Sequence, residues 1–169
     1  MLNSVSKESR KSTHILIKVW FTMFSMQFVY LIICYFMLNE KSYKTLYSPE
    51  ILKNTILYMN IDLYTNIYIL SIIILIGGYL YYKKAYSKLV NDTQEKEFQN
   101  IEEEFKYFKS KYLNIMFTCL AIFEIIAVIG LIVFLTTLDF STMAILIVIT
   151  AIGFLLVIPS ESKFIYSRI

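Results

Sequence analysis

Four apolar runs follow one another along the chain and are separated by polar segments. They cover residues 19–38, 63–82, 113–136 and 140–158. A helix of about 20 apolar residues spans the hydrocarbon core of a bilayer and satisfies its own backbone hydrogen bonds there. The pattern predicts an all-α, polytopic membrane protein. We expect four transmembrane helices in an antiparallel bundle, forming a single domain over residues 1–169.

The second and third helices are predicted to continue outside the membrane as a helical hairpin over residues 83–112. Asn91-Asp92-Thr93 is interpreted as the turn, with Asp92 and Glu95 spaced as a capping box that opens a helix over 95–137. Apolar residues then recur at alternating steps of three and four, which is typical of a heptad seam. The seam residues are Phe98, Ile101, Phe105, Phe108 and Tyr112.

The connection between the first two runs contains a helix start at Ser48-Pro49-Glu50. Serine is a preferred N-cap, proline suits the first helical position, and an acidic residue is favourable near the helix N-terminus. Apolar residues on one face after it predict a short interfacial helix over residues 49–59 on the outer membrane surface.

All four glycines of the chain lie inside the apolar runs and are predicted to be helix-packing positions. Without a Cβ, a glycine lets a neighbouring helix approach closely within a membrane. They are Gly77 and Gly78 in the second run, Gly130 in the third and Gly153 in the fourth.

Basic residues are distributed unevenly around the apolar runs. Three of the 16, namely Lys41, Lys44 and Lys53, lie in the connection between the first and second runs. The others lie before the first run, in the central connection or after the last run. Because short basic flanks stay in the cytoplasm, we expect both termini and the 83–112 hairpin to be cytoplasmic.

One polar residue lies near the middle of each apolar run, and one of the four is a carboxylic acid. They are Gln27, Ser71, Glu124 and Thr150. An acid at this depth is costly when ionised and faces the bundle interior. Two interpretations remain open: a proton- or cation-linked site, because a buried carboxyl exchanges protons, or a neutral acid that links helices and fixes their register.

The segment Glu124-x-x-Ala127-x-x-Gly130-Leu131 is followed by a short turn and a last apolar run that ends at Pro159. This arrangement, which covers about a third of the chain, resembles the final hairpin of uncharacterised small four-helix membrane proteins of bacteria. The resemblance implies a location in the bacterial inner membrane, as a multi-pass protein, and implies no activity.

Composition and motifs narrow the possible functions. Of the residues, 57% are hydrophobic, and no P-loop, dinucleotide fingerprint, catalytic triad or zinc spacing is present. We therefore expect no enzyme, no cofactor, no metal site and no nucleic-acid binding; the basic residues follow the topology instead of forming a patch. The expected surroundings are the lipid bilayer and a membrane-protein partner or a second copy of the chain.

Two functions remain. The first is a non-catalytic accessory or assembly subunit that binds another membrane protein through its spanning helices and cytoplasmic hairpin. The second is a small oligomeric transporter, linked to protons or cations, that uses Glu124. The absence of an inverted repeat of interrupted helices favours the first.

Overall fold

The computed structural model describes residues 2–40, 43–54, 61–160 and 163. Within them lie four α-helices and one short 3₁₀ helix, and the predicted all-α class is confirmed. In chain order they are α1 (Leu2–Asn39), η1 (Pro49–Lys53), α2 (Leu63–Glu95), α3 (Ile101–Thr137) and α4 (Phe140–Leu156).

Three helices are long and apolar enough to cross a membrane: α2, α3 and the part of α1 from Lys11 to Asn39. The helix α4 is apolar as well, but it has 17 residues. The architecture is therefore that of a membrane protein with three candidate transmembrane helices and a shorter apolar helix packed among them.

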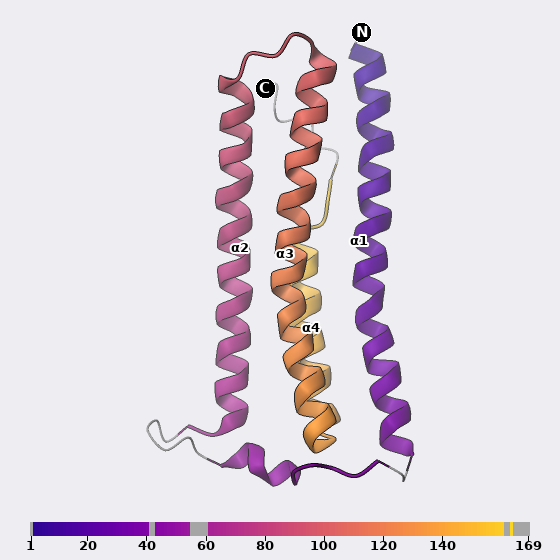
Figure 1. Ribbon diagram of the computed structural model, residues 1–169, viewed down its shortest axis with the longest axis vertical. Helices are drawn as coiled ribbons and strands as arrows, with labels where there is room; N and C mark the ends of the chain where they lie inside the picture. Colours follow the sequence, from indigo (N-terminus) through magenta and orange to yellow (C-terminus); the bar gives the residue numbers. More distant parts are fainter. Residues whose placement is uncertain (1, 41–42, 55–60, 161–162, 164–169) are drawn as a thin grey trace.

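The helix α3 lies at the centre of the bundle, between α1 and α2, and α4 packs along it (Figure 1). Both α1 and α2 contact α4 as well as α3. The beginning of α1 and the 96–100 connection lie at one end of the molecule, whereas η1 and the turn between α3 and α4 lie at the other (Figure 1).

The first helix is much longer than its apolar run. It has 38 residues, which corresponds to about 57 Å of helix, whereas the hydrocarbon core is about 30 Å thick. The predicted span 19–38 is thus the second half of a helix that begins at Leu2. The polar segment before the span continues the helix toward the end where α2 and α3 are connected (Figure 1).

The predicted turn at Asn91-Asp92-Thr93 is wrong: α2 continues to Glu95, and α3 begins at Ile101 instead of residue 95. The capping interactions explain the shift. Asn100 Oδ1 accepts the backbone N–H of Glu103 at 2.8 Å, and Glu103 Oε2 accepts that of Gln99 at 3.2 Å. This pair satisfies donors that the start of a helix leaves free.

In the connection between α1 and α2, the short helix η1 begins where the sequence predicts a helix start. The side chain of Ser48 accepts the backbone N–H of Glu50 and caps η1. Within the described residues the helix is shorter than predicted, because it ends at Lys53 and Asn54 is extended; residues 55–60 lie outside them. The backbone N–H groups of Leu46 and Tyr47 both donate to Thr136 O at 3.1 Å, which ties the connection to the end of α3.

The core lies where α3 meets its neighbours. Phe123 of α3 is fully buried and packs directly against Gly78 of α2 and Gly153 of α4. Gly130 of α3 packs in the same way against Met143 and Leu146 of α4. Gly77 differs: nothing lies within 4 Å of a Cβ built there, so it packs against no helix among the described residues.

The stalk, defined here as the parts of α2 and α3 within residues 83–112, is held together by aromatic rings. Phe108 and Tyr112 are buried, and their rings lie 6.4 and 6.1 Å from that of Tyr86 on α2. Two further seam residues, Ile101 and Phe105, are half-buried on α3. Phe98 lies in the 96–100 connection, before α3 begins, with its ring 5.5 Å from that of Tyr107.

Lys163, which follows α4 in the chain, contacts the half of α2 nearer the stalk. The Tyr86 hydroxyl donates to the Lys163 carbonyl at 2.9 Å, and Lys163 Nζ lies 5.1 Å from the centre of the Tyr82 ring. Burial lowers the pKa of the Lys163 amine. The chain therefore returns from α4 to pack against the stalk.

Candidate functional site

The carboxyl of Glu124 is hydrogen-bonded to a side chain of α1. The side-chain amide of Gln27 donates from Nε2 to Glu124 Oε2 at 2.5 Å. Gln27 is 1% exposed, and it shares the inner face of α1 with the buried residues Trp20 and Cys34. These residues are seven apart, so α1 presents one continuous side to α3 and α4. Two residues that are 97 positions apart in the chain thus meet inside the bundle.

Tyr30 is a second partner of Glu124 that the sequence analysis missed. Its phenol is one helical turn after Gln27 and lies close enough to interact with the same carboxyl. The sequence contained a signal for it, because residues three apart on a helix share a face. A tyrosine in an apolar run is also typical of an interfacial belt, so its presence alone does not indicate a polar partner.

The Gln27 amide leaves one buried atom unsatisfied. Its Oε1 has no hydrogen-bond partner, while its Nε2 donates to Glu124. An amide turned by half a rotation would place Oε1 on the carboxyl instead, where it accepts a hydrogen bond from a neutral acid. Gln27 can therefore bond to the Glu124 carboxyl whether that group is neutral or ionised.

The other two residues of the predicted mid-membrane cluster bond within their own helices. Ser71 Oγ donates to the Ile67 carbonyl at 2.8 Å, and Thr150 Oγ1 donates to the Leu146 carbonyl at 2.9 Å. Both side chains are fully buried. A hydroxyl that bonds one turn back satisfies itself without a partner helix. Of the four predicted residues, the structure therefore joins Gln27 and Glu124 by a hydrogen bond. The hydroxyl groups of Ser71 and Thr150 bond to neither of them.

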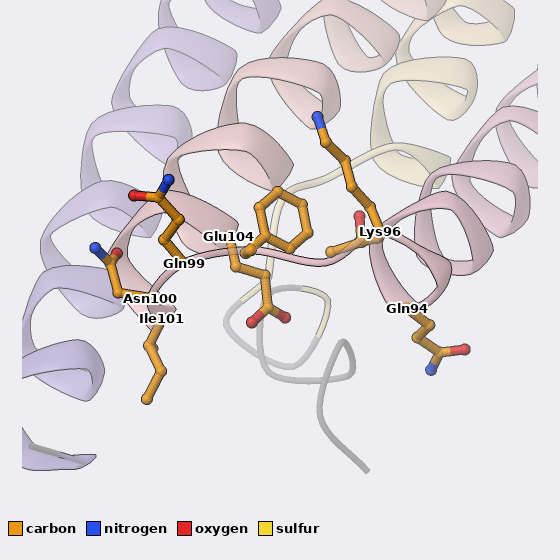
Figure 2. A pocket seen from close by; sticks show the side chains of 8 residues that line it. Gln94, Lys96, Gln99, Asn100, Ile101 and Glu104 are labelled. Carbon is orange, nitrogen blue, oxygen red and sulfur yellow. The ribbon is translucent and has the colours of Figure 1, made fainter.

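A hollow of about 480 Å³ lies at the tip of the stalk, where α2 gives way to the 96–100 connection. Figure 2 shows its polar side chains, which include Gln94, Lys96, Gln99 and Glu104. Their polar ends diverge: the Lys96 amine and the Glu104 carboxylate point in opposite directions, and the Gln99 amide points away from both (Figure 2). Side chains that fail to converge on one point do not define a ligand site.

Metal binding finds no support in the part of the chain that the structure describes. Among those residues, no group of three or more His, Cys, Asp or Glu side chains could hold a metal ion. The two cysteines, Cys34 and Cys119, are both buried and form no disulfide.

Comparison with known proteins assigns the chain to no family. No family model, no curated protein and no solved structure matches the chain. The candidate site therefore rests on its own chemistry: one carboxyl inside an apolar bundle, hydrogen-bonded to an amide and approached by a phenol, both from a single neighbouring helix.

Proposed function

We propose that this chain is an integral membrane accessory or assembly subunit that binds another membrane protein, or a second copy of itself, through its spanning helices and its stalk. It crosses the bacterial inner membrane four times as an antiparallel bundle, with both termini and the stalk in the cytoplasm. Its helices recognise a partner and carry out no reaction.

The observation that carries the proposal is an apolar seam on the outside of α1. Phe21, Phe28 and Tyr35 follow one another at steps of seven, and Ile32 lies between the last two. All four are more than half exposed. These four residues, the outer seam of α1, lie about 100° around the helix from Gln27 and Cys34. A seven-residue apolar repeat is the pattern with which one helix packs along another.

The low burial of the flanking helices supports the same conclusion. In the 18-residue apolar stretch of each helix, only 11% is buried in α1 and in α2, against 44% in α3. Lipid covers such surfaces as well as protein does, but membrane helices gain from close packing and from polar contacts with other helices. Rows of aromatic side chains are also frequent in protein interfaces.

Four spans follow if α4 crosses the membrane with its neighbours. Its 17 residues give about 25 Å of helix, and transmembrane helices begin at about 17 residues. Val157 and Ile158 extend its apolar character. Polar or charged groups bound it at both ends, with Asp139 capping its start and Lys163 following its end.

Photo-crosslinking in native membranes tests the proposal. A photoreactive residue replaces Phe28 on the outer seam, or Val148, which is equally exposed on α4. We expect a discrete crosslinked protein from position 28 and none from position 148. A product of twice the chain's 19.9 kDa would identify a second copy as the partner. The same products at both positions, or none at either, would contradict partner binding through α1.

A second candidate function is a proton- or cation-linked transporter, and the Gln27–Glu124 pair is the observation that favours it. A carboxyl that keeps its hydrogen bond in both protonation states is suited to exchange protons. Gln27 and Tyr30, however, are neutral donors, and such a pair serves equally well as a structural link between α1 and α3.

A further inference from the structure

A second groove, of about 320 Å³, runs between α2 and α3 at the base of the stalk. The polar residues from α2 are Tyr81, Lys88 and Asp92, and those from α3 include Lys111, Asn114 and Thr118. Each set follows the spacing of one helical face. The two faces together form a cleft with one end toward the apolar band and the other toward the tip of the stalk.

The two lysines flank the middle of this groove. Lys88 lies seven residues beyond Tyr81 on α2, and Lys111 lies seven residues before Thr118 on α3. Since α2 leads away from the apolar band and α3 returns to it, both lysines lie about 10 Å from the apolar end. Both are exposed, and Lys111 Nζ also lies 5.9 Å from the centre of the Tyr107 ring.

The polar groups around the lysines complete an anion site. The Asn114 side chain and the Tyr81 phenol carry hydrogen-bond donors at the apolar end of the groove. Asp92, one turn beyond Lys88, is the one carboxylate among the lining residues. Two ammonium groups with neutral donors suit a phosphate, and a carboxylate further out suits a hydroxyl group attached to that phosphate.

Beyond the apolar end of the groove, the same two helical faces continue with small residues, which we call the track. One turn before Tyr81 is Gly77, and one turn after Thr118 is Ala121; both are exposed. Nothing lies within 4 Å of a Cβ built on Gly77, so the space beside it is open. The neighbouring residues Leu80 and Phe117 are exposed and apolar. A free phosphate or a nucleotide would leave this track empty, whereas an acyl chain would fill it.

We propose that the groove binds an anionic phospholipid of the leaflet on the stalk side. Its phosphate lies between Lys88 and Lys111, its headgroup hydroxyl reaches Asp92, and an acyl chain follows the track past Gly77 and Ala121. Basic pockets between transmembrane helices are suited to anionic headgroups, and lysine side chains reach such headgroups from the edge of the hydrocarbon. The inference requires α2 and α3 to cross a membrane and is independent of a protein partner.

The test measures binding of short-chain phosphatidylglycerol to the full-length protein in neutral detergent, by native mass spectrometry and by the shift in melting temperature. The variants are the pair K88Q/K111Q, the control pair K84Q/K106Q and Gly77→Leu. Lys84 and Lys106 are exposed and do not line the groove. Inorganic phosphate and short-chain phosphatidylcholine serve as comparison ligands.

We expect K88Q/K111Q to weaken phosphatidylglycerol binding about tenfold or more, because charge-assisted hydrogen bonds are lost. The control pair should bind as the wild type does. Gly77→Leu fills the track and should weaken lipid binding while leaving the fold unchanged. Equal binding by the two lysine pairs would overturn the site. Saturable binding of inorganic phosphate that Gly77→Leu leaves unchanged would overturn the assignment to a lipid, as would equal binding of phosphatidylcholine.

Discussion

The ring of Phe123 lies so close to Gly78 that a Cβ built on this glycine would be 2.5 Å from Phe123 Cε1. The ring is held as tightly from α4, since a Cβ on Gly153 would be 2.6 Å from Phe123 Cγ. One aromatic ring of α3 therefore fills the space between a glycine of α2 and a glycine of α4. This contact sets how closely three of the helices approach.

Gly78→Ala should destabilise the bundle, and Gly77→Ala should not. The ring has little room to move away from a new methyl group at residue 78, because Gly153 also packs tightly against it, and overpacking of this kind costs about 1–3 kcal/mol. At residue 77 the added methyl meets open space. Thermal unfolding of both variants in detergent measures the difference. Equal melting temperatures would mean that Phe123 is not held between the two helices.

The capping of α3 yields a second prediction. Asn100→Ala removes the side chain that accepts the Glu103 N–H and should cost about 1 kcal/mol. Asp92→Ala, at the residue that the sequence suggested as the cap, should leave stability almost unchanged, since Asp92 is exposed within α2. Hydrogen exchange over residues 96–104 reports on both variants. Faster exchange in Asp92→Ala than in Asn100→Ala would restore the turn predicted at residues 91–93.

Sequence periodicity predicted the helical class and the burial of Phe108 and Tyr112, because apolar spacing reports directly on which face is covered. It also placed Glu124 and Gln27 at the same height, near the middle of their apolar runs. It failed at the stalk boundary, where two capping candidates compete and only the packed chain decides between them. Depth alone could not separate Gln27 from Ser71 and Thr150, because short hydroxyl side chains satisfy themselves on their own helix.

Rotational position is the other quantity that the sequence left open. Gly77 and Gly78 are adjacent, yet on a helix neighbouring residues point about 100° apart. Gly78 faces Phe123, and Gly77 faces outward. Which of the two packs depends on how α2 is turned against α3, and no local pattern fixes that angle when a helix is apolar on nearly every side.

Asp139 caps α4 and should contribute a pH-dependent part of the stability. Burial tends to raise the pKa of its carboxyl, but hydrogen bonds from Thr142, Tyr64 and the backbone outweigh it, so the pKa is lowered. A carboxyl with a lowered folded-state pKa stabilises the fold above its unfolded value of about 3.9. This stabilisation disappears as the pH falls through the folded-state pKa.

Melting temperatures of the wild type, Asp139→Asn and Asp139→Ala between pH 7 and pH 3 test this. Asparagine also caps helices, so Asp139→Asn should remain close to the wild type near neutral pH and should lose less of its stability in acid. Asp139→Ala should be less stable than both at neutral pH. An acid-induced loss of the same size in wild type and Asp139→Asn would show that the carboxyl at residue 139 is not responsible.

The membrane orientation can be tested with single cysteines at Ser6, Asn54 and Gln94, in a background without Cys34 and Cys119. The distribution of basic residues predicts that only the cysteine at residue 54 faces the outside. An impermeant thiol reagent applied to intact cells should therefore label residue 54 alone, and all three residues after the membrane is permeabilised. Labelling at residue 94 in intact cells would place the stalk outside and contradict the proposed topology.

The last prediction separates the two candidate functions and concerns the hydrogen bond between Gln27 and Glu124. Glu124→Gln keeps the shape of the side chain and a group that bonds to Gln27, so stability should change little. Glu124→Ala leaves the Gln27 amide without this partner and should cost about 1 kcal/mol, as for other hydrogen bonds between membrane helices.

Proton flux in reconstituted vesicles is measured on the same three proteins. A transporter that uses Glu124 must lose its proton flux in Glu124→Gln, because a side-chain amide does not release a proton near neutral pH. The variant should nevertheless remain folded. An accessory subunit shows no flux in any of them, and its only change is the lower melting temperature of Glu124→Ala. We expect the second result, because the partners of Glu124 are two neutral side chains on one helix, which suffice to join α1 to α3. Flux in the wild type that Glu124→Gln abolishes would instead establish the carboxyl as a proton-exchanging group and displace the proposed function.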